Sequence, residues 1–231
     1  MMIRTILFDL DNTLLDFNRA EKIAVTKALQ EAGLSVTEQV TRRYSQINLA
    51  QWRLLEKDEL TRSEVKVRRF RLLFEELGCG ASPQKAAKRY EELLAVGHYF
   101  IEGAPELLEA LEGKYRMYLV TNGTKSVQEG RLASAGILRY FQDVFISEEI
   151  GYNKPFREYF ECCFSKIPEF RKEETVIVGD SLTSDIQGGI NCGIRTIWFH
   201  PSDEVTDSDI HPDYRIRHLR ELPQLLKGII I

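Results

Sequence analysis

Short apolar runs alternate with amphipathic segments along most of the chain. Five runs rich in apolar and β-branched residues are each followed by turn residues, at 3–8, 115–120, 144–146, 175–178 and 195–199. Near-continuous apolarity in such short runs is typical of strands covered on both faces, as in a parallel sheet. Helical patterns lie between the runs, at 105–111, 126–135 and 156–166. This alternation predicts an α/β fold with a doubly wound parallel sheet and a Rossmann-like core.

One long stretch breaks the alternation. Residues 18–99 show no strand pattern, and their apolar spacing predicts four helices at about 19–32, 37–56, 62–77 and 83–97. We therefore expect a catalytic α/β core made of residues 1–17 and 100–231, with a helical cap domain at 18–99 inserted after the first strand. The insert is either a decoration or a lid over the end of that strand.

Local capping signals support the predicted helices. Asn18 with Glu21, and Thr61 with Glu64, have the spacing of capping boxes. Aromatic residues recur at helical intervals in the insert, which is more typical of a core than of a base-binding surface. They are Tyr44, Trp52, Phe70, Phe74 and Tyr90. We interpret a run of basic residues as a solvated helix face, with phosphate steering as the less favoured alternative. It consists of Lys66, Arg68, Arg69 and Arg71.

The composition narrows the partners. The chain has 231 residues, 43% of them hydrophobic, and 31 basic against 35 acidic residues give a net charge of −4. This balance supports a folded core and argues against binding a nucleic-acid polymer, which needs a basic surface. No cleavable leader or membrane-length apolar run is visible, so we expect a cytoplasmic monomer or homodimer without a membrane partner. The four cysteines have neither disulfide nor metal spacing, and we expect reduced thiols.

Polar residues follow each of four predicted strands. These segments are Asp9-Leu10-Asp11-Asn12-Thr13, Thr121-Asn122-Gly123-Thr124, Gly151-Tyr152-Asn153-Lys154-Pro155, and Gly179-Asp180-Ser181 with Asp185 beyond it. Each segment alone is also compatible with an ordinary turn, a helix cap or a surface lysine. Ligands of open α/β sheets bind outside the carboxyl ends of the strands, so the shared location indicates a site.

The carboxylates suggest a metal and a nucleophile. Asp9 and Asp180, with the backbone oxygen of Asp11, form a hard oxygen site suited to Mg²⁺. The ion would offset the penalty of several kcal/mol for burying unpaired carboxylates. Asp9 is placed to attack phosphorus and form an aspartyl-phosphate. Asp11 is placed to protonate the leaving oxygen and later to accept a proton from water.

The remaining groups suit a phosphoryl substrate. We expect Thr121, Asn122, Gly123 and Lys154 to hold the non-bridging phosphate oxygens, where phosphoryl transfer needs most of its stabilisation. Asp185 is expected to pair with Lys154 or to adjust the water shell of the metal. The expected partner is therefore a small phosphorylated metabolite.

The motifs DLDNTL, TNG, GYNKP and GDSLTSD, in this order, resemble those of the haloacid dehalogenase-like superfamily. The helical insert is similar to the first cap class of that superfamily, and the resemblance covers essentially the whole chain. It implies Asp9 as nucleophile, Asp11 as acid and base, Thr121 and Lys154 as phosphate binders, and Asp180 as metal ligand. It also implies that the first strand lies between the fourth and the second.

The residue at the position of Asp11 distinguishes the types of reaction within the superfamily. Dehalogenases lack an aspartate at this position because expelling a halide needs no proton, so Asp11 favours hydrolysis of phosphate esters. The opening DLDNTLLDF, the long cap and GYNKP resemble the branch of pyrimidine 5'-nucleotidases, which implies nucleoside 5'-monophosphates as substrates. A sugar-phosphate phosphatase, a phosphomutase and a non-catalytic phosphate-sensing protein remain as alternatives.

Overall fold

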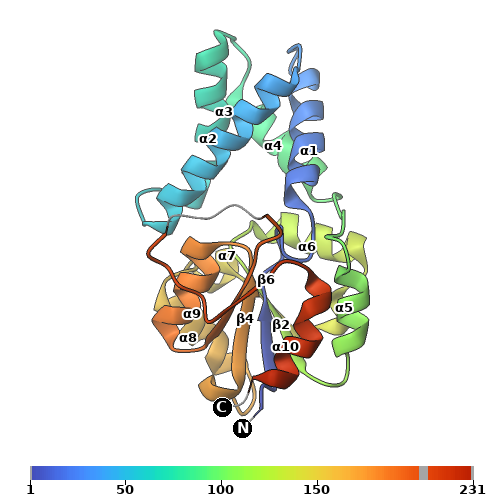
Figure 1. Ribbon diagram of the computed structural model, residues 1–231. Coiled ribbons are helices and arrows are strands. Elements are labelled where there is room, and N and C mark those ends of the chain that lie inside the picture. Colours follow the sequence, from blue (N-terminus) through green and yellow to red (C-terminus); the bar gives the residue numbers. More distant parts are fainter. Residues whose placement is uncertain (1, 203–207, 230–231) are drawn as a thin grey trace. The chain divides into compact units, whose positions relative to one another are not determined.

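The computed structural model describes residues 2–202 and 208–229, and the chain divides into two compact units (Figure 1). The core unit comprises Met1–Asp16, Tyr99–Lys125 and Ala135–Ile231. The helical unit comprises Phe17–His98 and Ser126–Ser134. No helix in the described ranges has the length and apolarity needed to cross a membrane.

The core unit contains a parallel sheet of six strands in the order β3-β2-β1-β4-β5-β6. The strands are β1 (Thr5–Phe8), β2 (Arg116–Thr121), β3 (Asp143–Ile146), β4 (Thr175–Gly179), β5 (Arg195–Phe199) and β6 (Tyr214–Ile216). The five predicted strands are confirmed, and β1 lies between β4 and β2 as expected. The pattern analysis missed β6, a three-residue edge strand in which only Ile216 is buried.

Helices flank this sheet, with α8 and α9 on one side and α5 and α10 on the other (Figure 1). The helices of this part of the chain are α5 (Ala104–Leu111), α6 (Lys125–Ala135), α7 (Ser147–Ile150), α8 (Arg157–Lys166), α9 (Gln187–Cys192) and α10 (Leu222–Gly228). Leu7 of β1 and Ile177 of β4 pack in one apolar cluster with Phe160 and Cys163 of α8. All four cysteines are free thiols, as predicted.

The helical unit contains the four predicted helices, α1 (Phe17–Glu31), α2 (Glu38–Glu56), α3 (Arg62–Leu77) and α4 (Pro83–Leu94). Thr61 and Glu64 form the predicted capping box of α3. Asn18 lies inside α1 and is not its N-cap, so that predicted capping box is wrong.

The aromatic side chains of the helical unit form its core. The rings of Tyr44, Phe70 and Tyr90 pack with centroids 5.0–5.6 Å apart, and all three side chains are fully buried. This confirms the predicted core role for these three, whereas Trp52 of the same predicted set is only half-buried. Arg69 is also buried, so the interpretation of the basic run as a wholly solvated face is wrong at this residue.

The division into units differs from the predicted domains at one segment. Ser126–Ser134 of α6 groups with the helical unit, although the prediction assigned it to the core. Gly130 lies so close to Ala95 that a Cβ there would come within 2.7 Å of the Ala95 carbonyl oxygen. Arg131 Nε donates a hydrogen bond of 3.0 Å to the carbonyl oxygen of Gly97. These contacts join residues far apart in sequence, and apolar periodicity does not reveal them.

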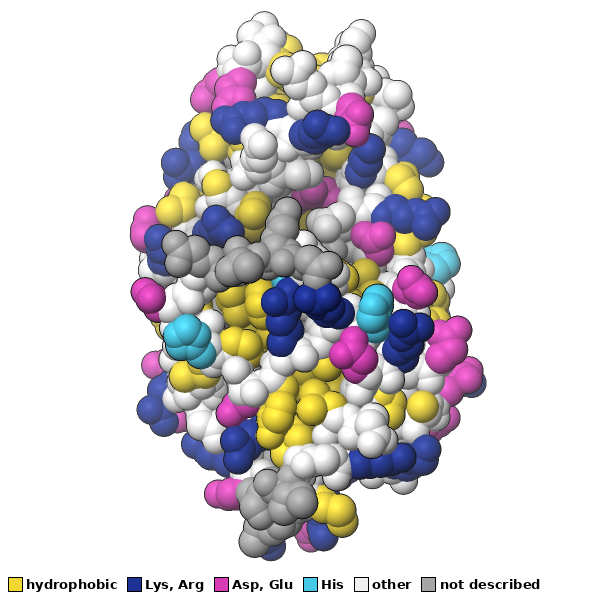
Figure 2. Space-filling model, in the orientation of Figure 1, with side chains coloured by type: hydrophobic (Ala, Val, Ile, Leu, Met, Phe, Trp, Pro, Cys, Tyr) yellow, Lys and Arg dark blue, Asp and Glu magenta, His cyan; other side chains and the backbone are white. Residues whose placement is uncertain are grey.

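The surface agrees with the mildly acidic composition. Figure 2 shows basic and acidic side chains interspersed over the face in view.

Candidate active site

The end of β1 places two aspartates at the carboxyl edge of the sheet. The backbone N–H of Asp9 donates to the carbonyl oxygen of Val178, so the ladder with β4 extends to this residue. The chain then turns tightly, because the N–H groups of Leu14 and Leu15 both donate to the carbonyl oxygen of Leu10. Asp9 is 5% exposed, whereas Asp11 on the turn is half-buried.

Lys154 is the positive centre of the site. Its Nζ donates to Asp9 Oδ1 at 2.7 Å, to Asp185 Oδ1 at 2.6 Å and to the carbonyl oxygen of Val120 at 2.9 Å. Its side chain is 1% exposed. The predicted pairing of Asp185 with Lys154 is therefore confirmed.

Asn122 joins the loop after β2 to the segment that carries Lys154. Its Nδ2 donates to the Lys154 carbonyl oxygen at 2.9 Å, and its Oδ1 accepts from the Lys154 N–H at 2.8 Å. Thr121, at the end of β2, is buried, and its Oγ1 accepts a hydrogen bond from the N–H of Gly123. The three predicted residues of this loop thus lie at the same sheet edge as Lys154.

The loop after β4 is shaped around Asp185. A Cβ on Gly179 would lie 2.3 Å from Asp185 Oδ2, so only glycine fits at this position. The same carboxylate oxygen accepts from the backbone N–H of Ser181 at 3.1 Å. Asp185 belongs to the π-helical turn Leu182–Ile186, which carries it back toward the strand.

Three carboxylates share this small space. Asp9, Asp180 and Asp185 each offer an oxygen, and these atoms all lie within 4.8 Å of one another. The predicted set for the metal was Asp9, Asp180 and the Asp11 position, with Asp185 in support.

Burial and the neighbouring carboxylates Asp185 and Asp11 raise the pKa of Asp9 to about 7, against the lowering effect of Lys154. Burial, followed by the charges of Asp9 and Asp185, raises the pKa of Asp180 well above its usual range. Burial opposes the charge of Lys154, but Asp185 and Asp9 outweigh it and hold the Lys154 pKa above its usual range.

With all three carboxylates ionised, the cluster would carry more negative charge than its single ammonium group can neutralise, which is why burial favours the protonated forms of Asp9 and Asp180. A divalent cation with a preference for oxygen ligands fits this donor set, because it would favour the ionised form of the carboxylates. Asp9 and Asp180, two of the predicted ligands, are the residues that would hold it, and an oxygen of Asp185 lies close enough to share it.

Two further residues of the site were missed by the sequence analysis. Thr13 is fully buried, and its Oγ1 donates to Asp9 Oδ2 at 3.1 Å. Trp198 of β5 donates from Nε1 to the carbonyl oxygen of Asp180 at 2.8 Å. Thr13 stands in the motif quoted above, so its position was a usable signal. Trp198 lies in an apolar strand and carried no signal.

Comparison with known proteins identifies the family of this chain. Residues 6–199 match the family model of haloacid dehalogenase-like hydrolases. The chain belongs to this family. The resemblance inferred from the four motifs is thereby confirmed, and this hydrolase has the expected Rossmann-like core.

Its relatives include the HAD-hydrolase YfnB from Bacillus subtilis. The crystal structure of YfnB bound to magnesium superposes with a TM-score of 0.93 at 39% identity, covering 98% of this chain and 99% of that one. The pyrimidine 5'-nucleotidase PynA of Streptococcus pneumoniae is 39% identical, over 100% of this chain and 98% of PynA. The pyrimidine 5'-nucleotidase YjjG of Escherichia coli is 28% identical, over 96% of each chain.

Proposed function

We propose that this hydrolase is a Mg²⁺-dependent phosphatase of nucleoside 5'-monophosphates that works through a phospho-aspartate at Asp9. The observation that carries the proposal is the excess of carboxylates around Lys154, with Asp9 and Asp11 on one turn. A purely structural cluster has no need of three mutually close carboxylates, whereas a divalent cation would balance their two excess negative charges and give a phosphoryl group a positive centre to approach.

Asp9 acts as the nucleophile. Lys154 holds its Oδ1 and Thr13 holds its Oδ2, so the carboxylate is oriented before substrate arrives. A bond forms between a carboxylate oxygen and phosphorus as the bond from phosphorus to the ester oxygen breaks. Asp11 donates a proton to that leaving oxygen, and the alcohol departs. Dividing one displacement into two lowers the barrier of each.

Water then completes the cycle. It attacks phosphorus of the phospho-aspartate, Asp11 takes its proton, and inorganic phosphate leaves with Asp9 regenerated. Lys154 and Thr121 stabilise the negative non-bridging oxygens in both steps. Asn122 contributes by fixing the backbone of Lys154, since both its carbonyl oxygen and its amide group bond that backbone. Bound Mg²⁺ would supply further positive charge against the phosphoryl oxygens.

The substrate class rests on the relatives. PynA and YjjG are pyrimidine 5'-nucleotidases, and each aligns with this chain over at least 96% of its own length. The groups at the edge of the sheet contact only what all phosphomonoesters share. Discrimination among leaving groups therefore falls to residues outside this edge, and we assign it to the helical unit inserted after β1.

Release of inorganic phosphate from a panel of phosphomonoesters tests this proposal. We expect nucleoside 5'-monophosphates to exceed hexose phosphates in kcat/KM by about tenfold or more, which corresponds to roughly 1.4 kcal/mol. If hexose phosphates are hydrolysed as well as every nucleotide, the nucleotide assignment fails and the phosphatase assignment stands.

Removal of the metal tests the cofactor separately. EDTA should silence phosphate release and added Mg²⁺ should restore it. Ca²⁺ should inhibit, because it takes more ligands in a looser geometry than an in-line attack tolerates. Full activity in excess EDTA would reject the metal site.

A further inference from the structure

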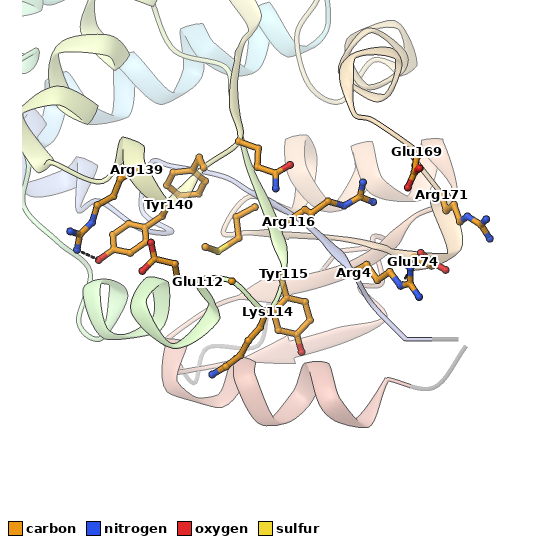
Figure 3. Close-up of a pocket in the computed structure, with 14 residues that line it drawn as sticks. Arg4, Glu112, Lys114, Tyr115, Arg116, Arg139, Tyr140, Glu169, Arg171 and Glu174 are labelled. Carbon is orange, nitrogen blue, oxygen red and sulfur yellow. Dashed lines mark hydrogen bonds and ion pairs between the residues drawn. The ribbon is translucent and has the colours of Figure 1, made fainter.

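A cleft of ≈ 650 Å³ lies in the core unit, at the amino ends of the strands (Figure 3). This volume falls within the range of about 300–1000 Å³ that is usual for small-molecule sites. Five basic side chains are among those that line it. They are Arg4, Lys114, Arg116, Arg139 and Arg171.

The cleft is remote from the candidate active site. Arg4 directly precedes β1, and Asp9 directly follows it. The backbone N–H of Arg4 donates to Glu174, and its carbonyl oxygen accepts from Arg116, so Arg4 is in register at the amino edge. Five residues of extended chain at about 3.3 Å each separate Arg4 from Asp9 by about 16 Å.

One end of the cleft gathers three of the five basic side chains with two acidic ones, which leaves one positive charge in excess. Figure 3 shows Arg4, Arg116 and Arg171 on the same side, together with Glu169 and Glu174. Arg116 is held in place by hydrogen bonds to the Pro168 carbonyl oxygen and to Thr5 Oγ1.

The cations at this end are only partly neutralised. Arg4 lies 3.6 Å from Glu174, but its side chain is 72% exposed, so water and salt weaken that pair. Within the described part of the chain, the guanidinium of Arg171 makes no hydrogen bond or ion pair. Arginine groups so arranged are suited to bidentate contact with a phosphate.

The rest of the cleft is lined by fewer charged side chains. Half-buried Phe141 contributes aromatic surface to the lining, beside Met117 and Tyr140, whose side chains are almost wholly buried. Arg139 donates a hydrogen bond of 2.6 Å to the Tyr140 hydroxyl, and its guanidinium group lies over the Tyr140 ring. A planar ring could pack against this surface while polar atoms of the ligand meet Arg139 and Glu112.

We propose that this cleft binds a phosphorylated small molecule of about nucleotide size, as a second site independent of the one at Asp9. Its phosphate oxygens contact Arg4, Arg116 and Arg171, and its ring lies against Phe141. The bare phosphate alone would leave most of the cleft unfilled. The proposal does not depend on the reaction assigned to the other edge of the sheet.

Calorimetric titration of the full chain with ADP, in EDTA, tests the site. Arg4→Glu/Arg171→Glu should raise the Kd for ADP at this site by about tenfold or more, or 1.4 kcal/mol. The matched control Arg220→Glu/Lys227→Glu reverses two exposed charges elsewhere in the core unit and should leave the Kd unchanged. Both variants should retain wild-type turnover of p-nitrophenyl phosphate. If the double variant melts early, Arg171→Glu alone replaces it, with a smaller expected effect.

Amide shifts locate the bound ADP. We expect ADP to perturb the ¹⁵N–¹H resonances of Met117 and Gln142 in the wild type, and to lose this effect in Arg4→Glu/Arg171→Glu. Perturbation confined to Asp9, Asp11 and Thr121 would overturn the second site, as would equal ADP affinity in both charge-reversal variants. Inorganic phosphate or adenosine binding as tightly as ADP would overturn the two-part ligand.

Discussion

Each unit of this hydrolase buries a cluster of charged and polar side chains, and the two clusters differ in their charge balance. In the helical unit, Glu21 accepts hydrogen bonds from Ser45 Oγ and from Asn48 Nδ2, and Asn48 Oδ1 accepts from Arg69 at 2.9 Å. Arg69 also lies over the Tyr90 ring, 4.6 Å from its centroid. In the core unit, one ammonium group faces three carboxylates.

The difference shows that burial of charge alone does not mark a functional site. The cluster at Glu21 contains one acid and one base, and side chains of the same unit satisfy its hydrogen bonds. Nothing from outside is needed to complete it, and its role is to hold α1, α2 and α3 together. The cluster at Lys154 has more acids than bases, and we propose that a divalent cation balances it, so this imbalance is what distinguishes it from the cluster at Glu21.

The largest effect should follow removal of the nucleophile. Asp9→Asn should lower kcat for p-nitrophenyl phosphate by at least about 1000-fold, because an amide cannot attack phosphorus. The fold should survive, since the amide oxygen still accepts from Lys154 and one buried negative charge is lost. Circular dichroism and the melting temperature check the fold. Turnover within tenfold of wild type would reject the covalent mechanism. It would also mean that the cluster at Lys154 differs from the cluster at Glu21 in charge but not in function.

Disrupting the cluster at Glu21 should have the opposite effect, with a loss of stability and no loss of turnover. Arg69→Ala should cost about 3 kcal/mol of unfolding free energy, because it leaves Glu21 buried without its countercharge. Turnover of p-nitrophenyl phosphate below the melting temperature should be retained. Urea denaturation measures the first quantity and a rate assay the second. The double variant Glu21→Gln/Arg69→Met should recover most of the stability. Loss of turnover in a folded Arg69→Ala protein would show that the helical cluster is also functional.

Because the pKa of Asp9 is raised, the excess of carboxylates around Lys154 should make the stability of the fold depend on pH. Its folded-state pKa of about 7 lies above the ordinary 3.8. Between these values the folded state binds a proton that the unfolded state has lost, so this group's contribution to stability falls as pH rises toward 7. Asn at this position does not titrate.

Melting in EDTA at about pH 5 and about pH 8 tests this, with Asp9→Asn as the reference. The variant should gain on the wild type as the pH rises. Glu21, whose pKa burial also raises, is present in both proteins and cancels in the difference. If the melting temperatures of the wild type and the variant change equally between these two pH values, the proposed excess of charge at Asp9 is contradicted.

The smallest expected effect concerns a neighbour of the cluster. Trp198→Phe should raise the Mg²⁺ concentration at half-saturation by about fivefold, since loss of one hydrogen bond to the Asp180 carbonyl costs roughly 1 kcal/mol. Calorimetric Mg²⁺ titration measures it without turnover. Trp52→Phe, in the helical unit, is the matched control. An unchanged Mg²⁺ affinity would show that Trp198 does not position Asp180.

Local patterns in the sequence were sufficient for most of the fold. Apolar runs predicted β1 to β5, and helical spacing with the Thr61 and Glu64 cap predicted α3. These signals work because strand and helix repeats and caps involve residues close in sequence. They failed for β6, which is short and mostly exposed, and for Asn18, whose capping pattern was overridden when Glu21 turned to α2.

The sequence by itself determined which residues gather at the carboxyl edge, since in a parallel sheet every strand ends there. Only the tertiary structure decided how they meet. Asp9 and Lys154 are 145 residues apart, and their contact depends on the crossovers that set the order β2-β1-β4. The bonds of Asn122 to Lys154 and of Trp198 to Asp180, and the single base among three acids, likewise follow from distances in space. The charge balance of a site depends on which charged groups lie close together in space, and the order of residues along the chain does not define those distances.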